Sequence, residues 1–204
     1  MIPERMNFDF IAPFYEPLAR LVFGNEHRRA EAFFLPEVPA GSRVLFVGGG
    51  AGHLLRRLLE TRHPAAVLYL EPSTAMRRRA QRRVRAVQGN EQVLFLRASG
   101  ELGGHPPCDV LLTPYVLDVF SDEALRNHFL PPLLHVLLPN ARWLFTDFVL
   151  PQHPAQRLLI RTMYLFFRLV AGIPAHRLPD YEAVFDWAGF RSTRQQHFAG
   201  SLIR

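Results

Sequence analysis

The feature that most constrains the fold of this chain is a regular alternation of short apolar runs with amphipathic segments, which begins at Arg43. Five runs are typical of buried strands: residues 44–47, 67–70, 93–96, 110–113 and 143–149. Three segments between them have apolar residues at helical spacing and predict helices: residues 53–61, a stretch capped by Ser73, and residues 123–138. Apolar strands joined by helices predict an α/β fold, a doubly wound and mostly parallel sheet covered on both faces.

The remaining segments predict additions to this sheet within one domain spanning residues 1–204. Residues 1–40 are aromatic and punctuated by proline, which indicates an N-terminal helical cap of one or two short helices. A helix with arginines on one side and aromatic residues on the other lies within 154–180 and predicts a helical lid insertion. A short helix over 180–188 and an antiparallel strand over 190–198 complete the expected order.

Composition excludes several classes of protein. The hydrophobic fraction is 49% with no apolar run long enough for a membrane span. Cys108 is the single cysteine, so no internal disulfide forms, and with no signal-like start the cytoplasm is the expected compartment. Lysine is absent, which excludes a Schiff-base enzyme and a P-loop because both need an amine.

The glycine-rich segment from Gly48 to Gly52 follows the first strand directly. Glycines allow a ligand to approach the backbone, and the following helix offers free N–H groups. The dinucleotide pattern G-x-G-x-x-G fails because its last position is His53, whereas G-x-G-x-G fits Gly48, Gly50 and Gly52. The alternative is a tight strand-to-helix turn that binds nothing.

Glu71 ends the second strand, 23 residues after Gly48. This is close to the spacing of about 20 residues at which a carboxylate binds the ribose hydroxyls beside a glycine loop. The alternative is a solvated acid near a helix N-terminus. Together, the loop and the acid predict a cofactor of the adenosine type.

On these residues the chain resembles the class I S-adenosylmethionine-dependent methyltransferases, whose first motif matches the segment from Leu45 to Gly52. The resemblance implies S-adenosylmethionine as cofactor, a Rossmann-like sheet of seven strands and no metal. The segment from Phe8 to Tyr15 is similar to the ubiquinone and menaquinone C-methyltransferase group. The resemblance implies these cofactor-binding residues: Tyr15, Gly48, Gly49, Gly50, Gly52, Glu71, Pro72, Ser73, Met76, Ser99, Gly100, Glu101, Pro114 and Tyr115.

Two positions depart from the family pattern. Phe46 stands where an acid usually lies two residues before the first glycine, and Ser99 stands where an aspartate often contacts the adenine amine. Phe46 motivates an alternative function, a catalytically silent cofactor-binding domain.

Asp118 and Asp147 are the candidates for a base that removes a proton from the methyl acceptor, because both lie near predicted strand ends. The alternatives are a helix cap for Asp118 and a solvated strand end for Asp147. A small, largely apolar acceptor is expected under the lid, in contact with four residues: Met163, Tyr164, Phe166 and Phe167. The alternative is that this apolar stripe belongs to the core.

Six arginines between Arg77 and Arg85 equal the whole net charge of +6. Because Met76, Ala80 and Val84 form the apolar face of this helix, the arginines are expected on its solvated face. Nucleic acid is therefore disfavoured as a partner. The alternative is an RNA methyltransferase or RNA-binding module that uses this basic helix.

Overall fold

The structure is a computed structural model that describes residues 24–149, 154, 157–158, 162 and 177–204. Residues 1–23 and most of the predicted lid thus lie outside the described residues. The elements, in chain order, are α2 (Glu26–Phe33), η1 (Leu35–Glu37), β1 (Arg43–Val47), α3 (His53–Arg62), β2 (Ala66–Leu70), α4 (Thr74–Val84), η2 (Asn90–Gln92), β3 (Val93–Leu96), η3 (Ser99–Leu102), β4 (Cys108–Pro114), η4 (Leu117–Val119), α5 (Asp122–Ala124), η5 (Leu125–Phe129), α6 (Leu130–Leu134), β5 (Leu137–Thr146) and α8 (Tyr181–Trp187).

The chain divides into two compact units. The first, called the sheet unit below, comprises Glu31–Pro114 and Pro132–Phe145. The second unit comprises Tyr115–Pro131, Thr146–Arg204 and the segment that ends at Ala30.

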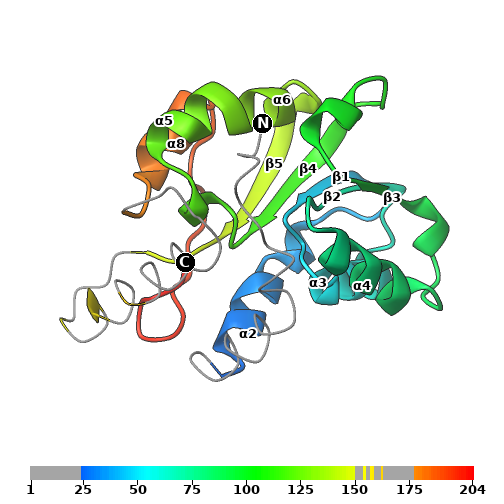
Figure 1. Cartoon of the computed structure of the whole chain (residues 1–204), viewed down its shortest axis with the longest axis horizontal. Helices are drawn as coiled ribbons and strands as arrows, with labels where there is room; N and C mark the ends of the chain where they lie inside the picture. Colours follow the sequence, from blue (N-terminus) through cyan, green and yellow to red (C-terminus); the bar gives the residue numbers. More distant parts are fainter. Residues whose placement is uncertain (1–23, 150–153, 155–156, 159–161, 163–176) are drawn as a thin grey trace. The chain divides into compact units, whose positions relative to one another are not determined.

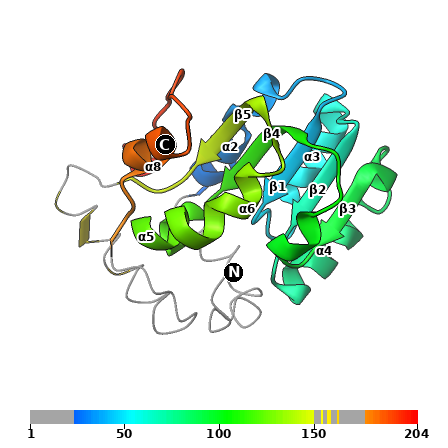
Figure 2. The same cartoon turned by 90° about the horizontal axis from the view of Figure 1, so that it is seen from above.

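The sheet unit contains a parallel sheet of five strands in the order β3-β2-β1-β4-β5. Figure 2 shows this order across the view. Phe46 is paired with Tyr69, and Tyr69 with Phe95, so three aromatic residues occupy one row of the sheet. The structure confirms the first four predicted strands; β4 is longer than predicted at both ends.

Helices α3 and α4 lie side by side next to β1, β2 and β3 (Figure 1). Helix α3 forms because its four leucines recur at helical spacing, and all four are buried: Leu54, Leu55, Leu58 and Leu59. Helix α4 begins at the predicted cap, where the Ser73 hydroxyl accepts the Met76 N–H at 3.1 Å.

Two predictions on the way to β5 are wrong in their bounds. The predicted helix over 123–138 is divided into α5, a π-helix (η5) and α6, and it ends at Leu134. Pro131 and Pro132 have no backbone N–H, so neither residue can donate the hydrogen bond to the fourth residue before it that a regular α-helix requires. The fifth strand covers Leu137–Thr146 instead of 143–149.

The second unit contains α8, as predicted. Asp180 caps it by accepting the Ala183 N–H at 3.1 Å, and Gly189 follows it with a φ of 80°. The predicted strand over 190–198 is wrong: residues 190–197 form no strand, and Phe198 makes only an isolated bridge to Ile203. Residues 191–197 all have polar side chains, the His197 imidazole included, and all are exposed. They therefore offer no alternating row of apolar side chains that a sheet could bury.

The predicted seven strands are not confirmed, because the described residues form a sheet of five. Next to β5, Asp147 and Arg204 exchange two backbone hydrogen bonds of 2.9 Å, and Phe148 forms an antiparallel bridge with Ile203. In the part of the chain that the structure describes, no helix is long and apolar enough to cross a bilayer.

Candidate functional site

The segments of the sheet unit that are predicted to bind the cofactor all begin at the same edge of the sheet. Val47 is in register with Leu70, and Leu70 with Leu96, so the chain leaves β1, β2 and β3 side by side. The Gly48 N–H donates to the Leu70 carbonyl at 2.9 Å, and the Glu71 N–H donates to the Leu96 carbonyl at 3.0 Å. Ligands bind at such carboxyl ends in open α/β sheets.

The glycine loop turns through left-handed backbone at Gly48, Gly50 and Gly52, with φ values of 68°, 58° and 80°. A side chain at Gly52 would lie 2.8 Å from Ala80, so glycine lets α3 approach α4. A Cβ at Gly50 would meet no atom of the described residues within 4 Å. The loop is therefore open beside Gly50, where a ligand can reach the backbone.

Glu71 is buried, with 6% of its surface exposed, and its carboxylate bonds two backbone amides. One oxygen accepts the Gly50 N–H and the other accepts the Ser73 N–H, each at 2.9 Å. The predicted acid thus contacts the predicted loop directly. A carboxylate offers about four acceptor positions, which is the chemistry that a pair of ribose hydroxyls requires.

The residues after Glu71 lie as the sequence predicts. Ser73 and Met76 are buried at the start of α4, and Pro72 connects them to β2. Arg77 donates to the Glu71 carbonyl at 2.8 Å and so fixes the backbone of the acid.

The segment after β3 is a short turn held by Glu101. One Glu101 carboxylate oxygen accepts the Arg97 N–H at 3.0 Å and the Ala98 N–H at 2.9 Å. Ser99 is half-buried, whereas Gly100 is exposed. Ser99, Gly100 and Glu101 therefore lie at the edge of the group of loops that follow β1, β2 and β3. The Glu101 carboxylate stabilises the turn to which it belongs.

Pro114 ends β4, and Tyr115 begins the second unit with an unusual backbone. Its φ is 51°, a left-handed conformation that is strained for a bulky residue. The Tyr115 N–H donates to the Thr146 carbonyl at 2.7 Å, and its hydroxyl donates to the His27 carbonyl at 3.1 Å. Its ring also packs on Phe148 at 5.1 Å, so several contacts hold the strained residue.

Asp118 and Asp147 form a hydrogen-bonded carboxyl pair in the second unit. Asp147 is fully buried: one oxygen accepts the Leu117 N–H at 2.9 Å and the Asp118 N–H at 3.2 Å, and the other accepts the Phe148 N–H at 2.9 Å. Burial raises the pKa of Asp118 to about 7. Burial and the neighbouring Asp118 raise the pKa of Asp147 as well, so the pair holds a proton at neutral pH.

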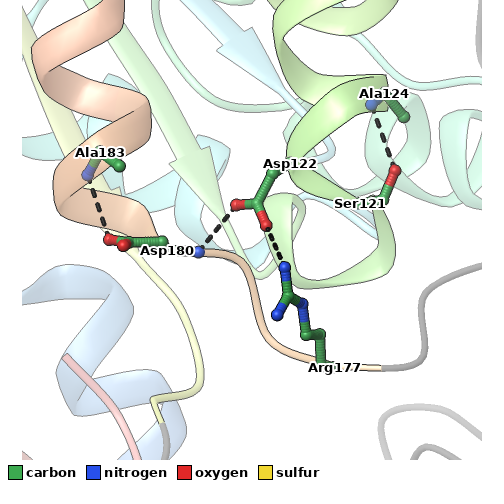
Figure 3. Close-up of polar contacts among 6 residues, drawn as sticks. All are labelled: Ser121, Asp122, Ala124, Arg177, Asp180 and Ala183. Carbon is green, nitrogen blue, oxygen red and sulfur yellow. Dashed lines mark hydrogen bonds and ion pairs between the residues drawn. The ribbon is translucent and has the colours of Figure 1, made fainter.

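Three contacts of the second unit were not predicted from the sequence (Figure 3). One Asp122 carboxylate oxygen accepts the Asp180 N–H at 2.8 Å, and the other accepts Arg177 at 3.3 Å. The Ser121 hydroxyl accepts the Ala124 N–H at 3.2 Å and caps α5. Asp122 thus connects the start of α5 to the approach to α8, 58 residues later.

The prediction that the arginines of this helix lie on its solvated face is wrong for three of them, Arg77, Arg79 and Arg83, which are partly buried. Arg83 donates to the Ala51 carbonyl of the glycine loop. The signal is present in the sequence, because Arg83 lies seven residues after Met76 and three after Ala80 and so shares their face. Three arginines are exposed as expected: Arg78, Arg82 and Arg85.

The structure also bears on the other predicted residues. Cys108 is buried and burial raises the pKa of its thiol to about 11, which leaves it an unreactive packing residue. Among the described residues, no cluster of His, Cys, Asp or Glu is suited to a metal ion. Five predicted residues lie outside the described residues: Tyr15, Met163, Tyr164, Phe166 and Phe167.

Comparison with known proteins identifies the fold. No protein-family model matches the chain, and no curated protein is a significant match to its sequence. Among solved structures, the chain is similar to the mitomycin 7-O-methyltransferase MmcR, with a TM-score of 0.67 at 17% identity. It is also similar to the mycolic acid cyclopropane synthase CmaA1, solved with SAH and CTAB (TM-score 0.61, 20% identity), and to YcgJ from Bacillus subtilis (0.60, 20%).

These likenesses cover most of this chain and less of the others. The matches span 95%, 81% and 79% of this chain, but only 57% of MmcR, 61% of CmaA1 and 68% of YcgJ. The chain therefore has the Rossmann-like methyltransferase fold, as the sequence predicted.

Proposed function

We propose that this protein transfers a methyl group from S-adenosylmethionine to a small, largely apolar acceptor. The observation that carries the proposal is the carboxylate of Glu71, buried at the end of β2 and bonded to the Gly50 amide of an open glycine loop. A ribose diol needs a carboxylate beside a backbone that it can approach closely. CmaA1, which has the same fold, was solved with SAH.

In this proposal the Glu71 carboxylate binds the ribose hydroxyls, while the side of the loop beside Gly50 admits the ligand. The segment after β3, with Ser99, borders the adenine, and Met76 supplies an apolar contact. S-Adenosylmethionine brings the activated methyl group. The protein's tasks are to align the acceptor, exclude water and remove a proton where the acceptor carries one.

We assign different roles to the two aspartates. Asp147 uses both oxygens for three backbone amides, so it positions the turn after β4 and the Asp118 side chain. Asp118 is half-buried and is the member of the pair proposed to accept a proton from the acceptor. A pKa of about 7 suits a general base at neutral pH.

A small acceptor is favoured over RNA because the basic helix is partly engaged by the protein itself. Arg77 and Arg83 bond the backbone of the sheet unit, which leaves a narrow exposed row of arginines. The apolar lid residues and the similarity of residues 8–15 to quinone C-methyltransferases support an apolar acceptor. The buried Cys108 fits a reducing compartment, the cytoplasm.

Calorimetric titration with S-adenosylhomocysteine tests the proposal. Glu71→Ala is expected to weaken binding by at least about tenfold, because a carboxylate contributes charge-assisted hydrogen bonds. Glu60→Gln is the matched control, since Glu60 is an exposed acid paired with Arg56 on α3, and its affinity is expected to equal that of the wild type. Equal affinity for Glu71→Ala and wild type would contradict the assignment.

Two further titrations separate the alternatives. NAD is expected to bind more weakly than S-adenosylhomocysteine, because His53 replaces a glycine of the dinucleotide pattern; the reverse order would contradict the proposal. Mass spectrometry of small molecules that co-purify with the protein is expected to reveal the acceptor. A protein that binds the cofactor but methylates none of them would be the silent cofactor-binding domain.

A further inference from the structure

Three side chains hold successive backbone groups of the glycine loop. Glu71 accepts the Gly50 N–H at 2.9 Å, and the Tyr69 hydroxyl donates to the Gly50 carbonyl at 2.9 Å. Arg83 donates to the next carbonyl, that of Ala51. Side-chain hydrogen bonds thus hold the loop on both sides of the Gly50 Cα.

Tyr69 reaches the loop from the middle of the core. It is fully buried in β2, and its ring packs edge-on against Phe46 at 5.1 Å and Phe95 at 5.3 Å. Burial raises the pKa of its hydroxyl well above the ordinary value, so the hydroxyl remains a donor at all physiological pH values. A buried phenol needs a hydrogen-bond partner, and the Gly50 carbonyl is that partner.

Gly49 shows that the loop and Tyr69 fit each other. A Cβ at Gly49 would lie 2.5 Å from the Tyr69 hydroxyl oxygen and 2.7 Å from the Phe46 ring. Glycine at this position is therefore required by the Tyr69 hydroxyl that approaches the loop, independently of any ligand. Phe46, which replaces the family's acid, completes an aromatic support under the loop.

Arg83 reaches the loop from α4. It is partly buried on the face of the helix that also carries Met76 and Ala80, whereas its neighbour Arg82 is exposed. A guanidinium that donates to a carbonyl makes a charge-assisted bond, which is stronger than a neutral one.

We propose that Tyr69 and Arg83 are positioning residues for the cofactor: by holding the Gly50 and Ala51 carbonyls they fix the loop and the Glu71 carboxylate bonded to it, so that Glu71 meets the ligand in place. This inference rests on the proposed function, because it assigns these residues to the same site. A loop already ordered binds without paying for ordering at the moment of association. Neither residue needs to contact the cofactor.

The test combines two measurements on the intact chain. Calorimetry gives the dissociation constant of S-adenosylhomocysteine, and hydrogen exchange of the Gly50 and Gly52 amides in the free protein reports the order of the loop. Tyr69→Phe removes only the hydroxyl and is expected to weaken binding about fivefold. Arg83→Met is expected to weaken it about tenfold, and Arg83→Lys to recover most of the loss because it keeps a donor. Tyr69→Phe and Arg83→Met are both expected to show faster amide exchange at the loop and a nearly unchanged midpoint of thermal unfolding.

Matched variants exclude general destabilisation. Arg82→Met removes an exposed arginine next to Arg83, and Phe95→Leu alters the packing around Tyr69 without touching its hydroxyl. Both are expected to bind like the wild type and to keep the loop amides protected. If Tyr69→Phe and Arg83→Met bind as tightly as the wild type with unchanged exchange at the loop, the inference is overturned while the proposed function stands. A wild-type chain that binds no S-adenosylhomocysteine would instead overturn the proposed function, and the inference with it.

Discussion

Glu71 in the sheet unit and Asp147 in the second unit perform the same task on different turns. Each is a buried carboxylate just after a strand, β2 for Glu71 and β5 for Asp147. Each bonds backbone amides of a turn that follows another strand: Glu71 the loop after β1, and Asp147 the turn after β4. Backbone N–H groups that would otherwise lie buried without acceptors are satisfied in this way.

The two carboxylates differ in their neighbours. Glu71 bonds two amides, whereas Asp147 bonds three amides and is also hydrogen-bonded to the Asp118 carboxyl. Burial and this second acid raise the pKa of Asp147, so the pair retains a proton. The same arrangement therefore occurs in two settings: the Glu71 carboxylate is bonded to the glycine loop, and the Asp147 carboxylate belongs to a pair that holds a proton.

The largest expected difference between the two carboxylates is in stability. Asp147→Ala leaves three amides without their acceptor and is expected to lower the free energy of unfolding by about 3–5 kcal/mol. Glu71→Ala affects two amides, one of them beside an open loop, and is expected to cost about 1–3 kcal/mol. Urea denaturation measures both values. Asp186→Ala, an exposed acid on α8, is the control and is expected to change stability by less than about 0.5 kcal/mol. Equal losses for Glu71→Ala and Asp147→Ala would show that the number of amides does not set the cost.

The carboxyl pair is expected to make stability depend on pH. Because the pKa of Asp118 is raised to about 7, the folded protein keeps a proton that the unfolded chain releases near pH 4. The stability that this proton contributes is full below about pH 4 and is lost as the pH rises through about 7, by about 2–4 kcal/mol. Asp118→Asn keeps a donor toward Asp147 and cannot ionise, so the variant is expected to lose this part of the dependence. Parallel pH profiles for the wild type and Asp118→Asn would contradict the shared proton.

Most of the sheet unit is predictable because its signals are local. Four strands and the helices α3 and α4 follow from apolar runs and helical periods shorter than a dozen residues. The second unit is held by contacts between distant residues, such as Asp122 with Asp180 and Asp147 with Arg204. Local periodicity contains no information on such pairs, and the strand predicted over 190–198 failed there.

The candidate site also contains some residues that local sequence signals predict and others that only contacts between distant elements identify. Glu71 and the glycine loop were predicted from spacing, and the structure places them in contact. The roles of Tyr69 and Arg83 were not predicted. A tyrosine within an apolar strand is typical of the core, and an arginine within a basic helix is typical of the surface. Their hydroxyl and guanidinium are identified only once β2, α4 and the loop after β1 are placed together.

The glycine loop of the sheet unit is expected to tolerate a methyl group at one position better than at the next. Gly49→Ala forces a Cβ against Tyr69 and Phe46 and is expected to cost about 2–3 kcal/mol of unfolding free energy. Gly50→Ala places its methyl group where no atom of the described part of the chain lies within 4 Å, so it is expected to cost only about 1 kcal/mol, for its left-handed backbone. Thermal or urea unfolding of the two variants tests this order. A greater loss for Gly50→Ala would mean that backbone conformation, not the aromatic support, limits the loop.

The smallest expected effects compare one helix cap from each unit. Ser73 caps α4 and Asp180 caps α8, each accepting one N–H at 3.1 Å, while their own N–H groups donate to Glu71 and Asp122. Ser73→Ala and Asp180→Ala keep these backbone bonds and remove the cap, so each is expected to lower the free energy of unfolding by about 1 kcal/mol. The charge of Asp180 also interacts with the N-terminus of α8, and added salt screens that interaction. The loss for Asp180→Ala is therefore expected to shrink in 1 M salt, whereas the loss for Ser73→Ala stays constant. Urea denaturation at low and high salt measures the difference. Asp180→Ser keeps a cap but has no charge, so the stabilisation by its cap is expected to be as independent of salt as that of the Ser73 cap. A salt-independent loss at both caps would show that hydrogen bonding alone stabilises these helix ends.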